Sequence, residues 1–124
     1  MNKTVINNFE DICNFKTIIK AYNSNEFALD LEGENLCRDG KINFIQLFFI
    51  QIEKIFIFNC SLLGKIEIQN VLKPILENEN NLKYMFDCRS DSDALYHQYE
   101  IKLKGVIDVQ LFEIGYRESF QDFR

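Results

Sequence analysis

The sequence has no tryptophan, one proline, one histidine and only five glycines among its 124 residues. So little proline and glycine excludes a collagen-like chain and a flexible linker between two domains. The four cysteines, at positions 13, 37, 60 and 88, never form the C-x-x-C spacing of zinc ribbons and thioredoxin-type redox sites. Hydrophobic residues make up 47% of the chain, so we expect one domain, residues 1–124, with its own core.

Basic residues are also in short supply. Lys and Arg number 14 against 19 Asp and Glu, which gives a formal net charge of −5. This balance excludes the broad basic face of a protein that holds nucleic acid mainly through phosphates, so any nucleic-acid role depends on a local site. A cluster of carboxylates that binds divalent cations is one such site.

No segment of the sequence favours a membrane or an export signal. The longest apolar stretch, residues 44–58, is too short for a bilayer and is interrupted by polar side chains. The first nine residues contain no apolar signal-peptide core. Together with four cysteines expected to be free thiols, this predicts an intracellular protein, cytoplasmic or nuclear, that is not secreted and has no membrane partner.

Hydrophobic spacing predicts three helices. They cover residues 8–22, 62–77 and 90–99. Pro74 is expected to kink the second helix or to start a shorter one. Ser90 or Ser92 is the expected N-cap of the third helix. Residues 110–124 are expected to be helical at first and frayed at the end.

Five apolar runs predict strands. They cover residues 27–31, 42–51, 55–60, 82–88 and 106–109. The short connection at residues 52–54 predicts an antiparallel hairpin. The element order therefore favours an α/β fold with a mixed sheet, three antiparallel strands followed by two parallel ones, and flanking helices. A ribonuclease H-like sheet has this order, and many other α/β folds share it.

Two carboxylates stand out at the end of the first predicted strand. Asp30 and Glu32 are separated by one residue, so both side chains leave the same face of that strand. Two such carboxylates favour a cation between them, and hard oxygen ligands favour Mg²⁺ or Mn²⁺. A polar strand end that simply faces solvent is the alternative.

A second acidic group follows the fourth predicted strand. Asp93 is expected in the first helical turn, where it would complete a cluster of three carboxylates if that strand lies beside the first. An Asp there also complements the helix dipole without any metal. Further acidic candidates nearby are Asp87, Asp91 and Asp108.

Two longer stretches carry a resemblance to a known family. Residues 27–47 read FALDLEGENLCRDGKINFIQL and resemble the first motif of the DEDD superfamily of 3'-5' exonucleases, which includes RNase D. The pattern D-x-E-G-x-N-L-x-R-x-G before a strand with I-Q is that of the Egalitarian-like branch, the exonuclease 3'-5' domain-containing proteins. Residues 85–111, MFDCRSDSDALYHQYEIKLKGVIDVQL, are similar to the second motif, D-C-R-x-x-S-D-x-L-x-x-Q-Y followed by D-x-Q.

The resemblance implies a ribonuclease H-like fold and hydrolysis of nucleic acid, RNA more than DNA, from its 3' end. Carried over by position, it makes Asp30, Glu32 and Asp93 the catalytic carboxylates that bind two Mg²⁺ or Mn²⁺ ions. One ion would activate water and the other would stabilise the leaving 3' oxygen. It also gives weaker substrate-binding candidates: Gly33, Asn35, Arg38 and Arg89.

The family's third motif is not assigned in this sequence. That motif is a Tyr or His followed closely by a last Asp, several dozen residues after the second motif. Tyr116 and Asp122 follow the last predicted strand directly, so we do not give them this role. Two functions stay open: a 3'-5' exonuclease, or a catalytically inactive module that binds nucleic acid or protein. A domain shortened in this way is expected to expose apolar side chains that self-association or a protein partner covers.

Overall fold

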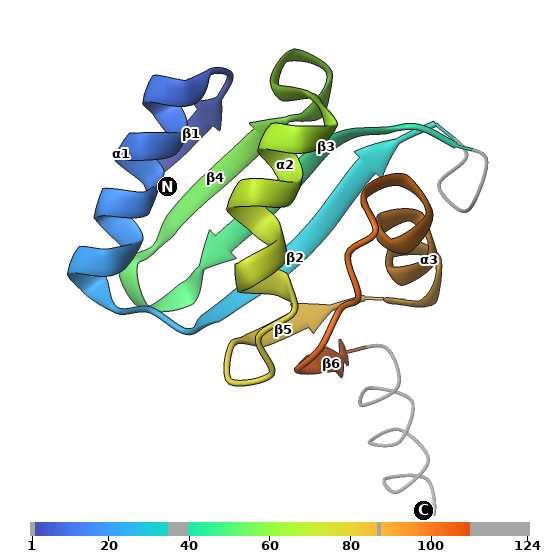
Figure 1. The fold of residues 1–124 in the computed structure, drawn as a ribbon. Helices are drawn as coiled ribbons and strands as arrows, with labels where there is room; N and C mark the ends of the chain where they lie inside the picture. Colours follow the sequence, from blue (N-terminus) through green and yellow to red (C-terminus); the bar gives the residue numbers. More distant parts are fainter. Residues whose placement is uncertain (1, 35–39, 87, 110–124) are drawn as a thin grey trace, which may run out of the picture.

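The computed structural model describes residues 2–34, 40–86 and 88–109 and contains one mixed sheet with helices packed on it (Figure 1). The strands are β1 (Asn2–Ile6), β2 (Glu26–Gly33), β3 (Ile42–Phe49), β4 (Lys54–Asn59), β5 (Leu82–Met85) and β6 (Val106–Asp108). The helices are α1 (Phe9–Tyr22), α2 (Cys60–Leu76) and α3 (Cys88–Tyr99), with a short 3-10 helix, η1 (Ile50–Ile52), between β3 and β4.

The six strands lie in the order β1-β4-β3-β2-β5-β6. β3 pairs antiparallel with β2 and with β4, while β5 is parallel to β2 and β6 is parallel to β5. This confirms the expected α/β fold. The sequence analysis missed β1, which pairs parallel with β4 at the edge of the sheet. Four of its five residues are exposed, so it lacks the apolar pattern that would reveal a strand.

The expected break in the second helix lies elsewhere. α2 consists of two helical segments that meet at Gly64, whose φ of 82° and ψ of 167° are not helical. A positive φ is accessible to glycine at little steric cost, which explains why the break falls here. Pro74 lies inside the helix without a comparable change of backbone angles, so the expectation of a kink at proline is wrong.

The third helix begins earlier than expected. α3 starts at Cys88, so Ser90 and Ser92 lie inside the helix and neither is its N-cap. The first turn contains Asp91, whose carboxylate complements the helix dipole. Asp93 consequently lies in the second turn instead of the first.

The core lies between the sheet and the helices α1 and α2, which cross one of its faces (Figure 1). Phe15 of α1 is fully buried at its centre. Its ring centroid lies 4.9 Å from those of Phe56 and Phe58 on β4, both in edge-to-face geometry. The apolar residues of α1 that recur at helical spacing therefore meet the alternating apolar residues of the strands, as the sequence predicts.

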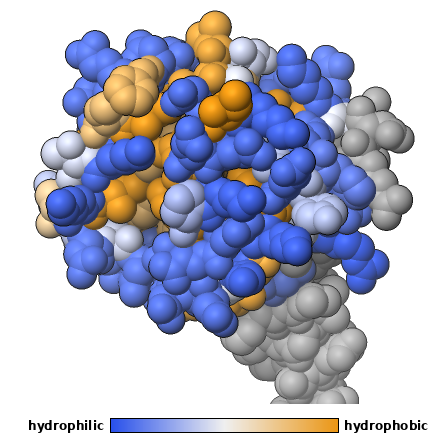
Figure 2. Space-filling model, viewed as in Figure 1, coloured by the Kyte–Doolittle hydropathy of each residue, from blue (hydrophilic) through white to orange (hydrophobic). Residues whose placement is uncertain are grey.

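The opposite face of the sheet is covered less completely. One row of apolar side chains in register crosses five strands: Ile55, Phe48, Ala28, Tyr84 and Ile107. We call these five residues the open face, because each of them is only partly buried. The helix side also has exposed apolar side chains, which Figure 2 shows between α1 and α2 and around the upper end of α2. Among them are Leu62 and Ile66, which are 66% and 70% exposed.

A buried lysine lies in the middle of β5. Lys83 is 0% exposed, and its Nζ donates a hydrogen bond of 2.6 Å to the carbonyl oxygen of Asn78 in the turn before the strand. Removal of the ammonium group from water lowers the pKa of Lys83 from 10.5 to about 8. The lysine anchors the α2–β5 turn, but its charge destabilises the folded state.

We expect this lysine to make the protein more stable as the pH rises from 8 to 9. In that interval the unfolded chain keeps the Lys83 proton and the folded chain loses it, so stability increases by about 1 kcal/mol. Urea denaturation of wild type and Lys83→Met at both pH values measures this effect. The contribution of Lys83 is the difference between the two proteins in how much their unfolding free energy changes from pH 8 to pH 9. Above pH 9 the raised pKa values of Cys60 and Tyr99 make the protein less stable as the pH rises, which opposes the effect of Lys83. A Lys83→Met variant with the same pH dependence as wild type would contradict the prediction.

Candidate functional site

Asp30 and Glu32 lie on one exposed face of β2. Leu29 and Leu31, which alternate with them, are buried against the helices. The period of two along the strand thus sends both carboxylates out of the same side of the sheet into solvent. The structure brings these two predicted site residues together.

A neutral amide lies beside the two carboxylates. Asp30 is paired across the strands with Gln46 of β3, and the Gln46 Nε2 donates a hydrogen bond of 3.0 Å to the Glu32 Oε1. The register of β2 and β3 then shifts between Glu32 and Gly33, a bulge of the kind that re-aims a side chain at a strand end. Because the amide carries no charge, Glu32 is oriented without being neutralised.

Asp93 comes from the first half of α3, the helix that follows β5. β5 is paired with β2 in parallel, which meets the condition set for the first and fourth predicted strands, and α3 follows β5. The Asp93 residue is exposed. The other end of α3 contacts the start of β3, where the Gln98 Oε1 accepts a hydrogen bond of 2.9 Å from the Ile42 backbone N–H.

The donor set suits a divalent cation, but the three carboxylates do not form a complete site. Their oxygens are hard ligands, and none of Asp30, Glu32 and Asp93 has an ion pair with a described residue. Within residues 2–34, 40–86 and 88–109, no three His, Cys, Asp or Glu side chains gather where they could hold a metal ion. The structure therefore provides a pair of carboxylates on β2 and a third carboxylate on α3.

The comparison with protein families decides the assignment. The family model for a 3'-5' exonuclease matches residues 7–116. This chain belongs to the 3'-5' exonuclease family. The resemblance to DEDD exonucleases is thereby confirmed.

Sequence relatives of this exonuclease domain include the piRNA biogenesis protein EXD1 of several animals. The human protein is 36% identical over 111 residues, which are 90% of this chain and 21% of the relative. The Bombyx mori protein is 33% identical over 101 residues, 81% of this chain and 31% of the relative. The chain thus spans less than a third of the length of these relatives.

Solved structures share the fold of the exonuclease domain. The Trypanosoma brucei RNase D in complex with GMP superimposes with a TM-score of 0.81 at 25% identity, over 90% of this chain and 34% of that one. The EXD2 exonuclease domain gives a TM-score of 0.79 at 14% identity, over 98% of this chain and 62% of that one. Both matches confirm the fold.

The other candidates that the structure describes are Gly33, Arg89, Asp91 and Asp108. Gly33 ends β2 and is exposed, and Arg89 is exposed in the first turn of α3. Asp91 and Asp108 each have an interaction partner. The candidates Asn35, Arg38 and Asp87 lie outside the described residues, as do Tyr116 and Asp122, which were given no role.

Two glutamines were missed as site residues by the sequence analysis. Gln46 lies in the I-Q pair after the first motif, and Gln98 lies in the Q-Y pair of the second. Both were quoted as part of a motif and given no role. Gln46 orients Glu32 through its hydrogen bond, and Gln98 joins α3 to the start of β3.

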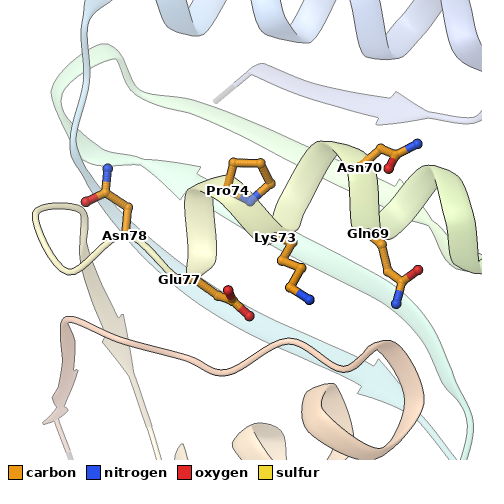
Figure 3. A pocket seen from close by; sticks show the side chains of 6 residues that line it. All are labelled: Gln69, Asn70, Lys73, Pro74, Glu77 and Asn78. Carbon is orange, nitrogen blue, oxygen red and sulfur yellow. The ribbon is translucent and has the colours of Figure 1, made fainter.

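A pocket of about 510 Å³ lies along α2 (Figure 3). Its lining residues are Gln69, Asn70, Lys73, Pro74, Glu77 and Asn78. The Gln69 Nε2 donates to the Tyr99 carbonyl oxygen at 2.8 Å, and the Glu77 Oε2 accepts from the Lys102 N–H at 2.9 Å. These bonds join α2 to the end of α3 and the segment after it, so the polar groups of the pocket have a structural role.

None of the helices in the described part of the exonuclease domain combines the length and the hydrophobicity that a membrane crossing needs.

Proposed function

We propose that this domain removes nucleotides from the 3' end of RNA in the presence of Mg²⁺ or Mn²⁺. The observation that carries the proposal is the pair Asp30 and Glu32, exposed at the end of β2 and without a basic partner among the described residues. The family match adds the reaction class. Relatives add the substrate, because one is named for piRNA biogenesis and RNase D was crystallised with RNA U12.

The ions would be held by Asp30 and Glu32 from β2 and by Asp93 from α3. EXD2 domain crystals soaked in Mn or Mg with a nucleotide support the choice of ions. Bound divalent ions supply an activated water and charge stabilisation for the leaving 3' oxygen. Because the three carboxylates are not gathered in the structure, ion binding requires their side chains to converge.

The test is an assay with labelled oligonucleotides. We expect the purified protein to shorten single-stranded RNA from its 3' end with Mn²⁺, and to do so faster than DNA of the same sequence. Chelation of the metal with EDTA should stop the reaction. Equal shortening in EDTA, or cleavage at internal positions, would contradict the proposal.

A catalytically inactive binding module is the second candidate function. It is favoured by the absence of a three-ligand cluster among the described residues. Fluorescence anisotropy with the same RNA distinguishes the two. Binding that persists in EDTA, without any shortening in Mn²⁺, supports the module and contradicts the exonuclease.

We further expect the open face to mediate self-association. Ile55 at one end of this row is partly buried beside Phe48, and a lysine there would place a charge next to apolar side chains. Multi-angle light scattering should show a dimer or larger species for wild type and a monomer for Ile55→Lys. Ile66→Lys on the helix side is the matched control, because Ile66 is 70% exposed on another surface. A wild-type monomer that binds no hydrophobic dye would contradict this prediction.

A further inference from the structure

One side chain connects the helix of the third carboxylate to the strands of the first two. The Gln98 Oε1 accepts a hydrogen bond of 2.9 Å from the Ile42 backbone N–H, and the Gln98 Nε2 donates to the carbonyl oxygen of Gly40. Both ends of the amide are therefore used, on two backbone groups of one short segment. Two hydrogen bonds from one amide group fix both the position and the orientation of the side chain.

The segment that Gln98 binds is the beginning of β3. Ile42 is the first residue of β3 and is paired with Gly33, the last residue of β2. Gly33 directly follows Glu32. A hydrogen bond of 3.2 Å from the Glu34 N–H to the Lys41 carbonyl oxygen joins the chain just after β2 to the chain just before β3. Gln98 thus binds next to the strand end that positions the carboxylate pair.

The same helix is fastened to α2 by different contacts. The Gln69 Nε2 donates a hydrogen bond to the Tyr99 carbonyl oxygen at 2.8 Å, and the Tyr99 side chain is buried. These contacts hold α3 against the helical layer. The contacts of Gln98 hold it against the sheet end where the carboxylates lie.

We propose that Gln98 is a positioning residue for cation binding, which it serves by setting the place of Asp93 relative to Asp30 and Glu32. The proposal rests on the function proposed above. Asp93 and Gln98 belong to one helix, so a shift of that helix relative to β3 moves Asp93. Residues that orient metal ligands without touching the metal typically contribute 10-fold to 100-fold to metal affinity.

The experiment compares the Mn²⁺ affinity of three proteins by isothermal titration calorimetry. Gln98→Met keeps much of the side-chain volume and removes both hydrogen bonds, and we expect it to weaken Mn²⁺ binding by about 10-fold. Gln69→Met is the matched control, because it also removes a part-buried hydrogen bond to α3, but one that leads to α2. We expect Gln69→Met to bind Mn²⁺ like wild type, even where both variants lose similar stability.

A second readout does not depend on the metal. Amide hydrogen exchange of the metal-free protein should become faster at Ile42 in Gln98→Met and stay unchanged there in Gln69→Met. Gln98→Asn, which is too short by one methylene to reach both backbone groups, should repeat both effects and replaces Gln98→Met if that variant does not fold. If neither variant folds, Gln98 serves folding and the positioning role is rejected.

The outcomes separate the two proposals. Wild type that binds no Mn²⁺ overturns the proposed function and the role of Gln98 together. Wild-type binding with unchanged affinity in the Gln98 variants overturns only the role of Gln98. An equal loss of affinity in Gln69→Met also overturns it, because general loosening of α3 would then explain the effect.

Discussion

Asp30→Asn should abolish the Mn²⁺-dependent shortening of RNA, with a loss of rate of roughly three orders of magnitude. The substitution keeps the size of the side chain and removes the charge that a divalent cation needs. Asp30 is exposed, so we expect the free energy of unfolding to change by less than about 0.5 kcal/mol. The measurement is the initial rate on end-labelled RNA, with urea denaturation of the same preparations.

The strand offers a matched control. Glu26 lies on the same face of β2 as Asp30, four residues away and therefore about 13 Å along the strand. Glu26→Gln removes an identical charge from the same strand, and we expect the wild-type rate. If Asp30→Asn retains the wild-type rate, the carboxylate pair is not the active site, and the exonuclease proposal fails with it.

The spacing of Asp30 and Glu32 was enough to predict their common face, because strand geometry is local and has a period of two. The helix α1 matched its prediction because its apolar stripe is long and regular. Each of these successes rests on a pattern that short stretches of sequence display.

The failures have equally physical reasons. β1 was missed because an exposed edge strand needs no apolar alternation. The break in α2 was placed at Pro74, although a glycine with positive φ changes the backbone direction more. The role of Gln98 could not be predicted, because it bonds a backbone group 56 residues away in the sequence. A side chain that binds backbone at such a distance leaves no local signal.

The largest effect on stability is expected for Phe15→Ala. Phe15 is fully buried, and its ring packs on three others: Phe49 at 6.2 Å and Phe56 and Phe58 at 4.9 Å. Removal of such a ring leaves a cavity and should lower the free energy of unfolding by about 3–5 kcal/mol. Since domains of this size are stable by only about 5–15 kcal/mol, the variant should unfold at a much lower urea concentration.

Phe9→Ala in the same helix gives the contrast that identifies burial as the cause. Phe9 is 68% exposed at the start of α1, so its truncation should change stability by less than about 0.5 kcal/mol. Phe15 packs on the helix side of the sheet, opposite to the carboxylates. At low temperature, where Phe15→Ala is still folded, this variant should therefore bind Mn²⁺ like wild type. Asp30→Asn should remain folded but fail to bind Mn²⁺. A Phe15→Ala variant as stable as Phe9→Ala would show that the rings of β3 and β4 do not pack on α1 as described.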